Sequence, residues 1–294
     1  MPLQKPFITQ LQSRLTGDFN QPVTIRSVSP VSGGSINSAW CVHTDNGDFM
    51  LKVNSKSAYP GMFRLEAEGL ATIRNTQTIA VPNVILHGDF DDHSFLLLEW
   101  IDAQRATPQA SQQLGRQLAA MHRHTANHFG FTANNYMGSL PQSNRQHANW
   151  SAFFVAERLQ SMVKLGVDKH LLNSQDVQNF EKLYLRLPEL FAEEQPALIH
   201  GDLWGGNYII GTNGIPYLID PAVSYGHREF DLAMTTLFGG FAREFYEAYH
   251  EAYPLAPNWQ LRTDLWNLYP LLLHLNLFGT GYLGQVREGL QQYV

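Results

Sequence analysis

The chain has little cysteine, no clustered basic charge and no repeated or low-complexity segment. Cys41 is the only cysteine among 294 residues, so the sequence excludes an intramolecular disulfide and predicts no zinc site built from cysteines. Lysine and arginine never form a run and the formal net charge is -6, which argues against non-specific binding of nucleic acid. Hydrophobic residues make up 44% of the chain and charged residues 16%, which predicts a folded protein with a sizeable core.

Signals for membrane insertion or export are also missing. Residues 1–17 are polar and rich in glutamine, and they lack the apolar core of a signal peptide. The most apolar tract, residues 268–283, is interrupted by His274 and Asn276 and is too short and too polar to span a bilayer. Together with the single cysteine, which fits a reducing compartment, this pattern predicts a cytoplasmic protein without a membrane partner.

Residues 1–101 and 102–294 follow different patterns, which predicts two lobes of an α+β protein. In the first part, Asp45–Asp48 is typical of a hairpin turn because Asn-Gly tolerates positive φ. Apolar residues at helical spacing predict a helix over 62–75. The expected strands cover residues 40–44, 49–53, 84–86 and 94–101, the last two separated by a polar turn at 88–93.

The second part is dominated by helical stripes of apolar residues, around 114–121, 154–163 and 177–187. Among them lies a strong strand signal at 197–200, 208–210 and 216–219, with a turn at Asn213-Gly214. We therefore expect one small sheet embedded in a larger helical lobe.

A segment of this small sheet carries the candidate chemistry: His200-Gly-Asp-Leu-Trp-Gly-Gly-Asn207, followed by Ile219-Asp-Pro221. Phosphoryl transfer from ATP needs a carboxylate to accept the proton of the attacking hydroxyl, and oxygen ligands for magnesium. Asp202 and Asn207 provide a base and an amide oxygen on one loop, and the hairpin returns Asp220 to the same place. An isolated His-Gly-Asp is often only a tight turn, but the ordered set is far more specific.

These motifs resemble the aminoglycoside and choline kinase superfamily, and within it the fructosamine kinase (ketosamine 3-kinase) family. The matching segments, which extend the likeness from about Val31 to the C-terminus, are Leu198–Asn207, Ile219–Ala222, Gly226–Met234, Phe238–Phe241 and His274–Tyr282. The resemblance implies the two-lobed protein-kinase-like fold and the cofactors ATP and Mg2+. It also implies that Asp202 is the base, that Asn207 and Asp220 are the magnesium ligands, and that His200 supports the loop.

The N-terminal lobe is expected to hold the nucleotide. On the predicted strand, residues 49, 51 and 53 face one side and Lys52 faces the other, from which it can reach the α- and β-phosphates. A lysine that is simply exposed to solvent on a strand is the common alternative. Glu66 shares the inward face of the predicted helix with Leu70 and Ile73, whereas Glu68 points away. We therefore predict a Lys52–Glu66 pair, as the resemblance also implies.

Two further segments are candidates for binding ATP. Gly33, Gly34 and Ser35 lie in a short glycine-containing loop that can cover the phosphates, although the motif is weak and a simple turn explains it as well. Some relatives carry a cysteine where Ser35 stands. The backbone of Glu99, Trp100 and Ile101, at the end of the last strand of the lobe, is expected to bind adenine.

Four side chains are candidates for contact with the acceptor: Trp204, His274, Asn276 and Tyr282. Trp204 follows the proposed base closely and can stack on a sugar or amine, but a packing tryptophan is nearly as common. The other three are polar residues in an apolar tract, which indicates a pocket wall or, more commonly, satisfied buried groups. We interpret His122, His124 and His128 as surface or helix-end residues.

The most specific hypothesis is therefore a kinase that phosphorylates the 3-hydroxyl of a ketosamine, a small-molecule or glycated-amine substrate. Two alternatives remain, a kinase of an aminoglycoside, choline-like amine or other metabolite, and a non-catalytic nucleotide-binding module. A protein kinase is disfavoured because His200-Gly-Asp replaces His-Arg-Asp and no Ala-Pro-Glu segment follows Asp220. The sequence leaves the oligomeric state open.

Overall fold

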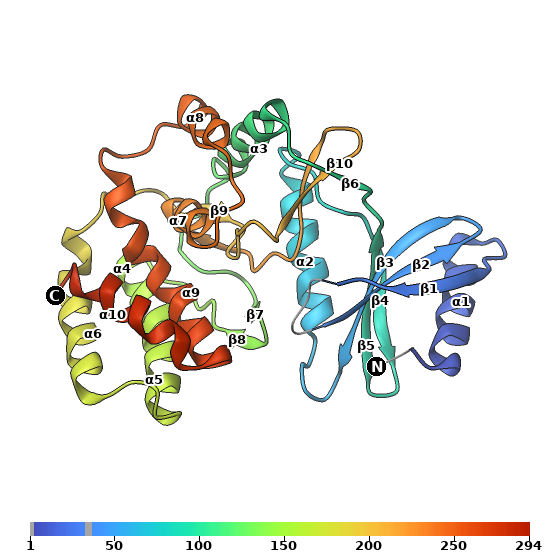
Figure 1. Ribbon diagram of the computed structural model, residues 1–294, viewed down its shortest axis with the longest axis horizontal. Coiled ribbons are helices and arrows are strands. Elements are labelled where there is room, and N and C mark those ends of the chain that lie inside the picture. Colours follow the sequence, from blue (N-terminus) through green and yellow to red (C-terminus); the bar gives the residue numbers. More distant parts are fainter. Residues whose placement is uncertain (1–2, 33–36) are drawn as a thin grey trace.

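A five-stranded antiparallel sheet forms the centre of the N-terminal lobe in the computed structural model, which describes residues 3–32 and 37–294 (Figure 1). The strand order is β1-β2-β3-β5-β4. The strands are β1 (Ile25–Pro30), β2 (Ser38–Thr44), β3 (Gly47–Ser55), β4 (Val84–Phe90) and β5 (His93–Glu99).

The turns of this sheet confirm one expectation and correct another. The β2–β3 hairpin is present as predicted, and Gly47 takes a φ of 107° that favours glycine. The segment expected to be a turn at residues 88–93 is mostly strand, because β4 continues to Phe90 and Gly88 pairs with Phe95. The chain reverses at Asp91, which has a φ of 53°. The prediction was wrong because the polar residues on the exposed face of β4 resemble a turn in composition.

Two helices cover opposite faces of the sheet. The predicted helix is α2 (Met62–Asn75), which lies between the sheet and the C-terminal lobe in Figure 1. The other, α1 (Lys5–Phe19), was not predicted, and it packs Phe7, Leu11 and Leu15 on the outer face of the sheet.

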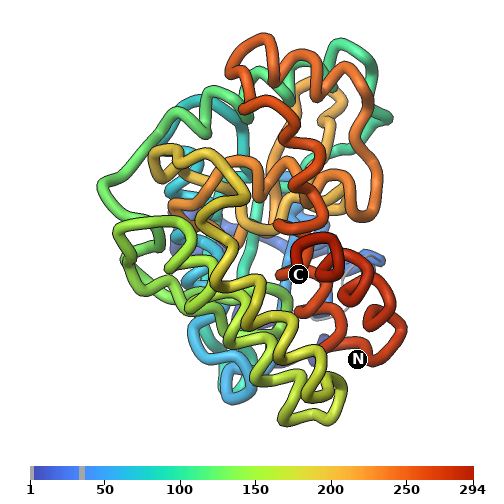
Figure 2. The backbone as a smooth tube through the Cα atoms, turned by 90° about the vertical axis from the view of Figure 1, so that its left-hand side faces the viewer, coloured from blue at the N-terminus to red at the C-terminus, as the bar shows by residue number. Residues whose placement is uncertain are grey.

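The C-terminal lobe is mainly helical, as predicted. Its helices are α3 (Pro108–Met121), α4 (Trp150–Phe153), α5 (Gln160–Asp168), α6 (Ser174–Arg186), α7 (Glu229–Leu237), α8 (Arg243–Ala252), α9 (Thr263–Phe278) and α10 (Leu283–Gln291). A π-helical segment (Phe154–Leu159) joins α4 to α5, and 3-10 turns occupy Leu187–Glu189, Trp259–Arg262 and Thr280–Tyr282. In Figure 2, α5, α6 and α10 face the viewer at the end of the lobe farthest from the sheet.

Most of the apolar tract noted in the sequence belongs to α9, which is buried along most of its length. Its apolar side chains form the centre of the main C-terminal core cluster. None of the helices in residues 3–32 and 37–294 is long and apolar enough to cross a membrane.

The strands of the C-terminal lobe form three small sheets rather than the single sheet expected. The three-stranded sheet contains β6 (Ala103–Gln104), β10 (Tyr208–Gly211) and β11 (Pro216–Leu218). The two-stranded sheets pair β9 (Ala197–Ile199) with β12 (Ser224–Gly226), and β7 (Asn135–Met137) with β8 (Leu140–Gln142). Strand β9 belongs to one of these sheets and β11 to another. The loops that follow the two strands meet in the space between the sheets.

The two lobes share a hydrophobic cluster. On one side, Phe63 and Leu70 of α2 and Leu98 of β5 contribute, and on the other, α3 and α8 contribute buried residues such as Leu118 and Phe245. The expected division between residues 101 and 102 falls between β5 and β6, whose partner β10 belongs to the C-terminal lobe. The division itself stays a prediction.

Candidate active site

The loop after β9 has a backbone that only a few residues could form. Gly201 has a φ of 82°, and a Cβ added there would lie 2.2 Å from the carbonyl oxygen of Ala222. Glycine is therefore required for the loop to pass close to the segment that follows Asp220. The same turn directs the side chain of Asp202 into the space between the lobes, where it lines the cleft.

His200 connects this loop to the segment that carries Asp220. Its Nε2 lies 2.9 Å from the carbonyl oxygen of Ile219, and its Nδ1 accepts a 3.2 Å hydrogen bond from the backbone N–H of Asp202. Since a carbonyl can only accept, the proton of the neutral ring is on Nε2. Burial lowers the pKa of His200 below its usual value and keeps the ring neutral. The supporting role that the sequence predicts for His200 agrees with these contacts.

Asp231, in the first turn of α7, braces the same loop from behind. Its fully buried carboxylate accepts hydrogen bonds from the backbone N–H groups of His200 (2.7 Å) and Gly201 (2.9 Å). The third partner is His122 Nε2 at 3.1 Å, whose Nδ1 contacts the hydroxyl of Tyr249 at 2.8 Å. His122 ends helix α3 as expected, but it is completely buried and not a surface residue, because it links α3 and α8 to this carboxylate.

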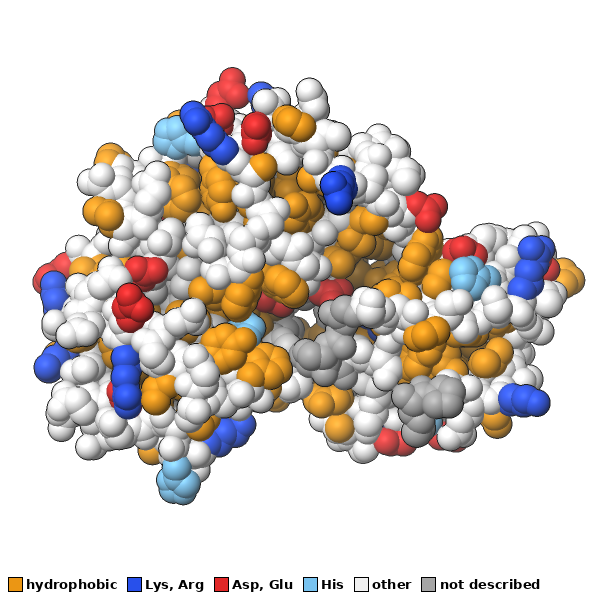
Figure 3. Space-filling view, viewed as in Figure 1, with side chains coloured by type: hydrophobic (Ala, Val, Ile, Leu, Met, Phe, Trp, Pro, Cys, Tyr) orange, Lys and Arg blue, Asp and Glu red, His pale blue; other side chains and the backbone are white. Residues whose placement is uncertain are grey.

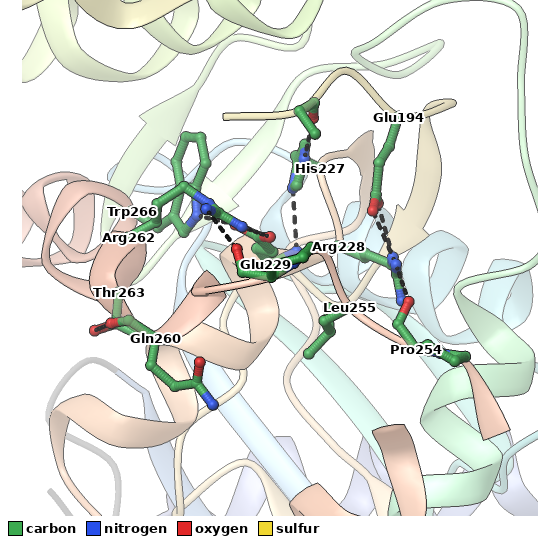
Figure 4. A network of polar contacts seen from close by, with 12 residues as sticks. Glu194, His227, Arg228, Glu229, Pro254, Leu255, Gln260, Arg262, Thr263 and Trp266 are labelled. Carbon is green, nitrogen blue, oxygen red and sulfur yellow. Dashed lines mark hydrogen bonds and ion pairs between the residues drawn. The ribbon is translucent and has the colours of Figure 1, made fainter. Parts of the chain in front are cut away.

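The start of α7 is held by a network of charged side chains, shown in Figure 4. Arg228 donates to Glu194 at 2.7 Å, and Arg262 donates to Glu229 at 2.6 Å. The indole N–H of Trp266 also donates to Glu229, at 3.0 Å. Buried charges persist when they are paired and hydrogen-bonded in this way. The network therefore fixes the position from which Asp231 reaches the loop.

Asn207 lies against Asp202 as the spacing of the motif predicts. Its amide Nδ2 donates to the backbone oxygen of Asp202 at 2.8 Å and to the carboxylate Oδ2 at 3.0 Å. Burial at the floor of the cleft raises the pKa of Asp202 to about 7, and the negative charge of Asp220 adds to this rise. A carboxylate with a pKa near neutrality can accept a proton from a hydroxyl and release it again.

Lys52 joins the two lobes through a pair of carboxylates. Its Nζ lies 2.7 Å from Glu66 Oε1 of α2 and 2.6 Å from Asp220 Oδ1 of the C-terminal lobe. Burial alone would lower the pKa of Lys52, but the two carboxylates raise it above its usual value and keep the ammonium charged. The predicted choice of Glu66 agrees with the geometry, because Glu68 instead forms an exposed pair with Arg64.

The donor atoms near Asp220 suit a hard divalent cation. Both Nδ2 hydrogen bonds of Asn207 go to Asp202, so its Oδ1 remains for another partner. The side chain of Asp220 is 41% exposed toward the cleft, and a φ of 54° turns it away from the strand path. Amide and carboxylate oxygens are the ligands that Mg2+ prefers. The residues present therefore fit a magnesium ion.

These side chains line one cleft of about 530 Å³ between the lobes. Figure 3 shows the surface hollowed there, with acidic side chains at its floor and apolar ones on its walls. Glu99, Trp100 and Ile101 border the cleft as predicted for an adenine site. The N–H of Glu99 already donates to the backbone oxygen of Asn83 at 2.8 Å, so it is occupied within the lobe.

The loop expected to cover the phosphates is described only in part. Gly33, Gly34 and Ser35 lie outside the described residues, and their predicted role is not tested. Ser32 and Asn37, which flank them, line the cleft.

Trp204 and His274 form the wall on the C-terminal side of the cleft. The indole of Trp204 lies over Gly206, where an added Cβ would approach a ring atom to 2.2 Å, and it meets the ring of Phe238 edge-on. His274 Nδ1 lies 2.7 Å from the carbonyl oxygen of Pro270, so Nδ1 carries the proton of the neutral ring. Nε2 is left as an acceptor.

Comparison with known proteins identifies the family to which this arrangement of residues belongs. The profile of the family described as "Fructosamine kinase" matches residues 7–294. The chain belongs to the fructosamine kinase family. A Synechocystis sp. protein assigned as a ketoamine kinase is 39% identical over 302 residues, covering 99% of this chain and 99% of that protein. A chloroplastic protein-ribulosamine 3-kinase of Oryza sativa subsp. indica is 37% identical over 275 residues, covering 92% and 79% of the two chains.

Solved structures agree with this membership. A Thermobifida fusca protein assigned as a fructosamine-3-kinase superposes with a TM-score of 0.87 at 34% identity, covering 97% of this chain and 98% of that one. Aminoglycoside phosphotransferase APH(4)-Ia, in a complex with AMP-PNP and hygromycin B, shares the fold with a TM-score of 0.62 at 17% identity, covering 96% and 98%. The predicted two-lobed protein-kinase-like fold is therefore confirmed. As a member of a kinase family, the chain is a phosphotransferase that uses ATP and acts on a hydroxyl group.

Two of the residues predicted to contact the acceptor do not line the cleft of this fructosamine kinase family member. Asn276 is buried on α9 and donates to the carbonyl oxygens of Met162 and Leu272, so its contacts support a packing role. Tyr282 is half-buried and packs against the ring of His274, with centroids 5.1 Å apart. In the sequence, the polarity of Asn276 and Tyr282 could not distinguish residues of a pocket wall from buried residues whose hydrogen bonds are satisfied.

One segment that lines the cleft was missed. Residues 135–138, in the β7–β8 hairpin, line the same cleft as Asp202 and Asn207. Asn135 donates to the backbone of Val223 at 3.0 Å, and the Tyr136 hydroxyl donates to the backbone of Pro60 in the N-terminal lobe at 3.2 Å. Only the Met137-Gly138 turn between short polar runs hinted at a hairpin, and nothing local indicated that it faces the cleft.

Proposed function

We propose that this protein transfers the γ-phosphoryl group of ATP to the 3-hydroxyl of a ketosamine, such as a fructosamine or ribulosamine adduct of an amine. The observation that carries this proposal is the convergence of Lys52, Asp202, Asn207 and Asp220 in one cleft. Segments from both lobes supply these groups, and phosphoryl transfer depends mainly on positioning and charge stabilisation. A non-catalytic nucleotide-binding module would not need a base and metal ligands placed together.

The N-terminal lobe positions the nucleotide. The backbone of residues 99–101 binds adenine, and Lys52 extends from β3 toward the phosphates. Glu66 holds the ammonium from the side of α2, so Lys52 can exchange its contact with Asp220 for phosphate oxygens without losing its counter-charge.

The magnesium ligands are Asn207, through Oδ1, and Asp220. These residues would hold a Mg2+ ion, whose positive charge would offset the negative charge that develops on the phosphates. His200 and the bond from the backbone N–H of Ile219 to Asn207 O, at 3.0 Å, keep the two ligand-bearing segments together.

Asp202 acts as the base. Its carboxylate takes the proton from the 3-hydroxyl while that oxygen bonds to the γ-phosphorus, and the bond from this phosphorus to the β–γ bridging oxygen breaks. The products are the phosphorylated ketosamine, ADP and a proton held first by Asp202. Asn207 fixes the carboxylate through its 3.0 Å hydrogen bond, so the acceptor oxygen meets the base in one orientation.

The acceptor side of the cleft supports a sugar-like substrate. The half-buried indole of Trp204 offers an apolar face on which a sugar or amine can stack, and Nε2 of His274 can accept a hydrogen bond from a hydroxyl. The relatives assigned as ketoamine and ribulosamine 3-kinases favour this acceptor class and the 3-position. The likeness to aminoglycoside phosphotransferase is one of fold alone.

The test is acceptor-dependent ADP release with Mg-ATP, using fructosyl-lysine, ribosyl-lysine-derived ribulosamine, an aminoglycoside and choline as acceptors. We expect turnover with a ketosamine and loss of turnover in Asp202→Asn. Turnover only with another amine would overturn the ketosamine assignment but keep the catalytic residues. ATP binding without turnover of any acceptor would favour the non-catalytic alternative.

A further inference from the structure

A second group of ligand atoms lies outside the catalytic machinery, on the β2–β3 hairpin. Cys41 and His43 are two residues apart on β2, so their side chains share one face of the sheet. Asp48 of β3 is the cross-strand partner of His43, and Cys41 is paired with Met50. Within residues 3–32 and 37–294, these are the three side chains of metal-ligand type whose ligand atoms all lie within 4.8 Å of one another.

The distances match those around a single small cation. Nδ1 of His43 lies 3.0 Å from Oδ1 of Asp48 and 3.8 Å from Sγ of Cys41. Zinc bonds of about 2.0 Å to nitrogen and oxygen and about 2.3 Å to sulfur, at tetrahedral angles, place ligand atoms roughly 3.3–3.7 Å apart. The two distances from Nδ1 of His43 lie within a few tenths of an ångström of this range, and the sulfur of Cys41 and the carboxylate of Asp48 lie within 4.8 Å of each other.

The surroundings favour a bound cation. The other ring nitrogen of His43, Nε2, lies 3.3 Å from the hydroxyl of Ser29, the kind of outer partner that orients a metal-bound histidine. Burial, followed by the negative charges of Asp48 and Asp102, raises the pKa of the Cys41 thiol to about 11, so a cation displaces the thiol proton when it binds. Cys41 itself is buried, whereas the side chains of His43 and Asp48 are 35% and 41% exposed, which leaves a path for an ion from solvent.

We propose that Cys41, His43 and Asp48 form a binding site for a divalent cation of the zinc class. One sulfur, one nitrogen and one oxygen ligand suit zinc or cobalt and leave a fourth position for water. The catalytic centre offers only oxygen ligands and therefore selects magnesium, so the two sites differ in the cations they prefer. The sequence led us to expect no zinc site built from cysteines. A mixed set of ligands needs only one cysteine, and Cys41 can supply it.

The position of this site predicts its consequence. Ala39, which precedes Cys41 on the same face of β2, and Met50, the cross-strand partner of Cys41, both line the nucleotide cleft. A cation would tie the two strands together beyond the adenine end of the cleft. We expect it to raise the melting temperature and to alter KM for ATP, while the chemical step at Asp202 is unaffected.

The single cysteine makes the site testable by spectroscopy. The full chain, stripped of metal with a chelator, is titrated with Co2+ and its absorption recorded. A thiolate bound to Co2+ gives a charge-transfer band in the near ultraviolet, and only Cys41 can supply that thiolate. We expect the band to appear with one equivalent of Co2+ and to disappear when Zn2+ is added in competition.

Matched variants separate this site from the catalytic one. Cys41→Ser should lose the band, and His43→Gln and Asp48→Asn should weaken Co2+ binding by more than about tenfold. Asp220→Asn, at the magnesium site, and His124→Gln, at an exposed histidine, should keep both band and affinity. No band in the unaltered protein, or a band that survives in Cys41→Ser, would overturn the proposal and leave His43–Asp48 as a simple ion pair.

Discussion

Asp202 lies on the loop after β9, and Asp231 of α7 holds that loop through hydrogen bonds. The surroundings of the two carboxylates nevertheless give them different roles. Asp202 faces the cleft and has a pKa of about 7 because of burial and the nearby charge of Asp220. Asp231 faces away from the cleft and is occupied by two backbone N–H groups and His122. The first residue can exchange protons with a substrate, and the second can only hold the loop in place.

The raised pKa of Asp202 implies a measurable effect on stability. A carboxyl whose folded pKa is about 7, above its ordinary value of 3.8, stabilises the fold at low pH and loses that contribution as the pH rises through about 7. Asp202→Asn removes this loss. The melting temperature of the variant relative to the unaltered protein should therefore rise between about pH 5 and about pH 8. Differential scanning fluorimetry checks this, and an equal difference at both pH values would contradict it.

The same pKa governs activity. Because only the ionised carboxylate can accept the hydroxyl proton, kcat/KM should fall as the pH decreases through about 7. Asp202→Asn should lower kcat by about 10²- to 10⁴-fold, the range for a positioned general base.

Lys52 provides a second prediction at this scale. Lys52→Met leaves the carboxylates of Glu66 and Asp220 without their shared cation, so the phosphates lose a positive contact and face two uncompensated charges. We expect kcat/KM for ATP to fall by about 10²-fold. Lys56→Met is the matched control, because Lys56 pairs with Asp89 on the exposed side of the same lobe. An equal loss in both variants would contradict the role assigned to Lys52.

Helix α7 transmits the order of the C-terminal core to the catalytic loop. The ion pairs of Arg228 and Glu229 fix its first turn, and Asp231 extends that order to the loop. Asp231→Asn places an amide N–H against one of the two backbone donors. We expect a loss of about 1–3 kcal/mol in stability, with lower kcat and little change in the Kd for ATP.

The control for this helix is Asp176→Asn. Asp176 is also an acidic residue in the first turn of a helix, α6, where it completes a capping box and pairs with Arg287 far from the cleft. Its loss should reduce stability without changing kcat of the folded enzyme. If both variants retain full kcat, the loop does not depend on the brace.

The elements that the sequence predicted well are those with strong local signals. The bounds of α2 and the β2–β3 hairpin followed from apolar spacing and from Asn46-Gly47. Helix α1 was missed because its composition is mainly polar, although Phe7, Leu11 and Leu15 recur at helical spacing and are the residues that become buried. In this helix only one narrow stripe of apolar residues packs against the sheet, and that stripe is not apparent from the composition of the whole segment.

The pairing of short strands depends on distant partners, which local patterns do not record. The strand signals at β9, β10 and β11 were correct, but their division into two sheets depends on β12 and β6. For the same reason, the β7–β8 hairpin was not assigned to the cleft. The residues that we propose as catalytic could be grouped from the sequence because their motif fixes residue types and spacing together, whereas the proposed acceptor wall combines separate segments.

At the scale of the whole molecule, the lobes share a core instead of meeting only at a hinge. Buried residues of α2 and β5 form one cluster with residues of α3 and α8. We expect calorimetry to show a single cooperative transition, shifted to higher temperature by AMP-PNP and Mg2+ because these bind between the lobes of the folded state. Two separate transitions would contradict the shared core.

The most direct test of the central claim is phosphoryl transfer with ATP labelled at the γ-phosphate and fructosyl-lysine as acceptor, with the product located by NMR. We predict label on the 3-hydroxyl in a magnesium-dependent reaction, and transfer at least about 10²-fold slower by Asp202→Asn, which should still bind ATP. Transfer to another position, or transfer by Asp202→Asn at the unaltered rate, would contradict the assignment of the acceptor or of the base.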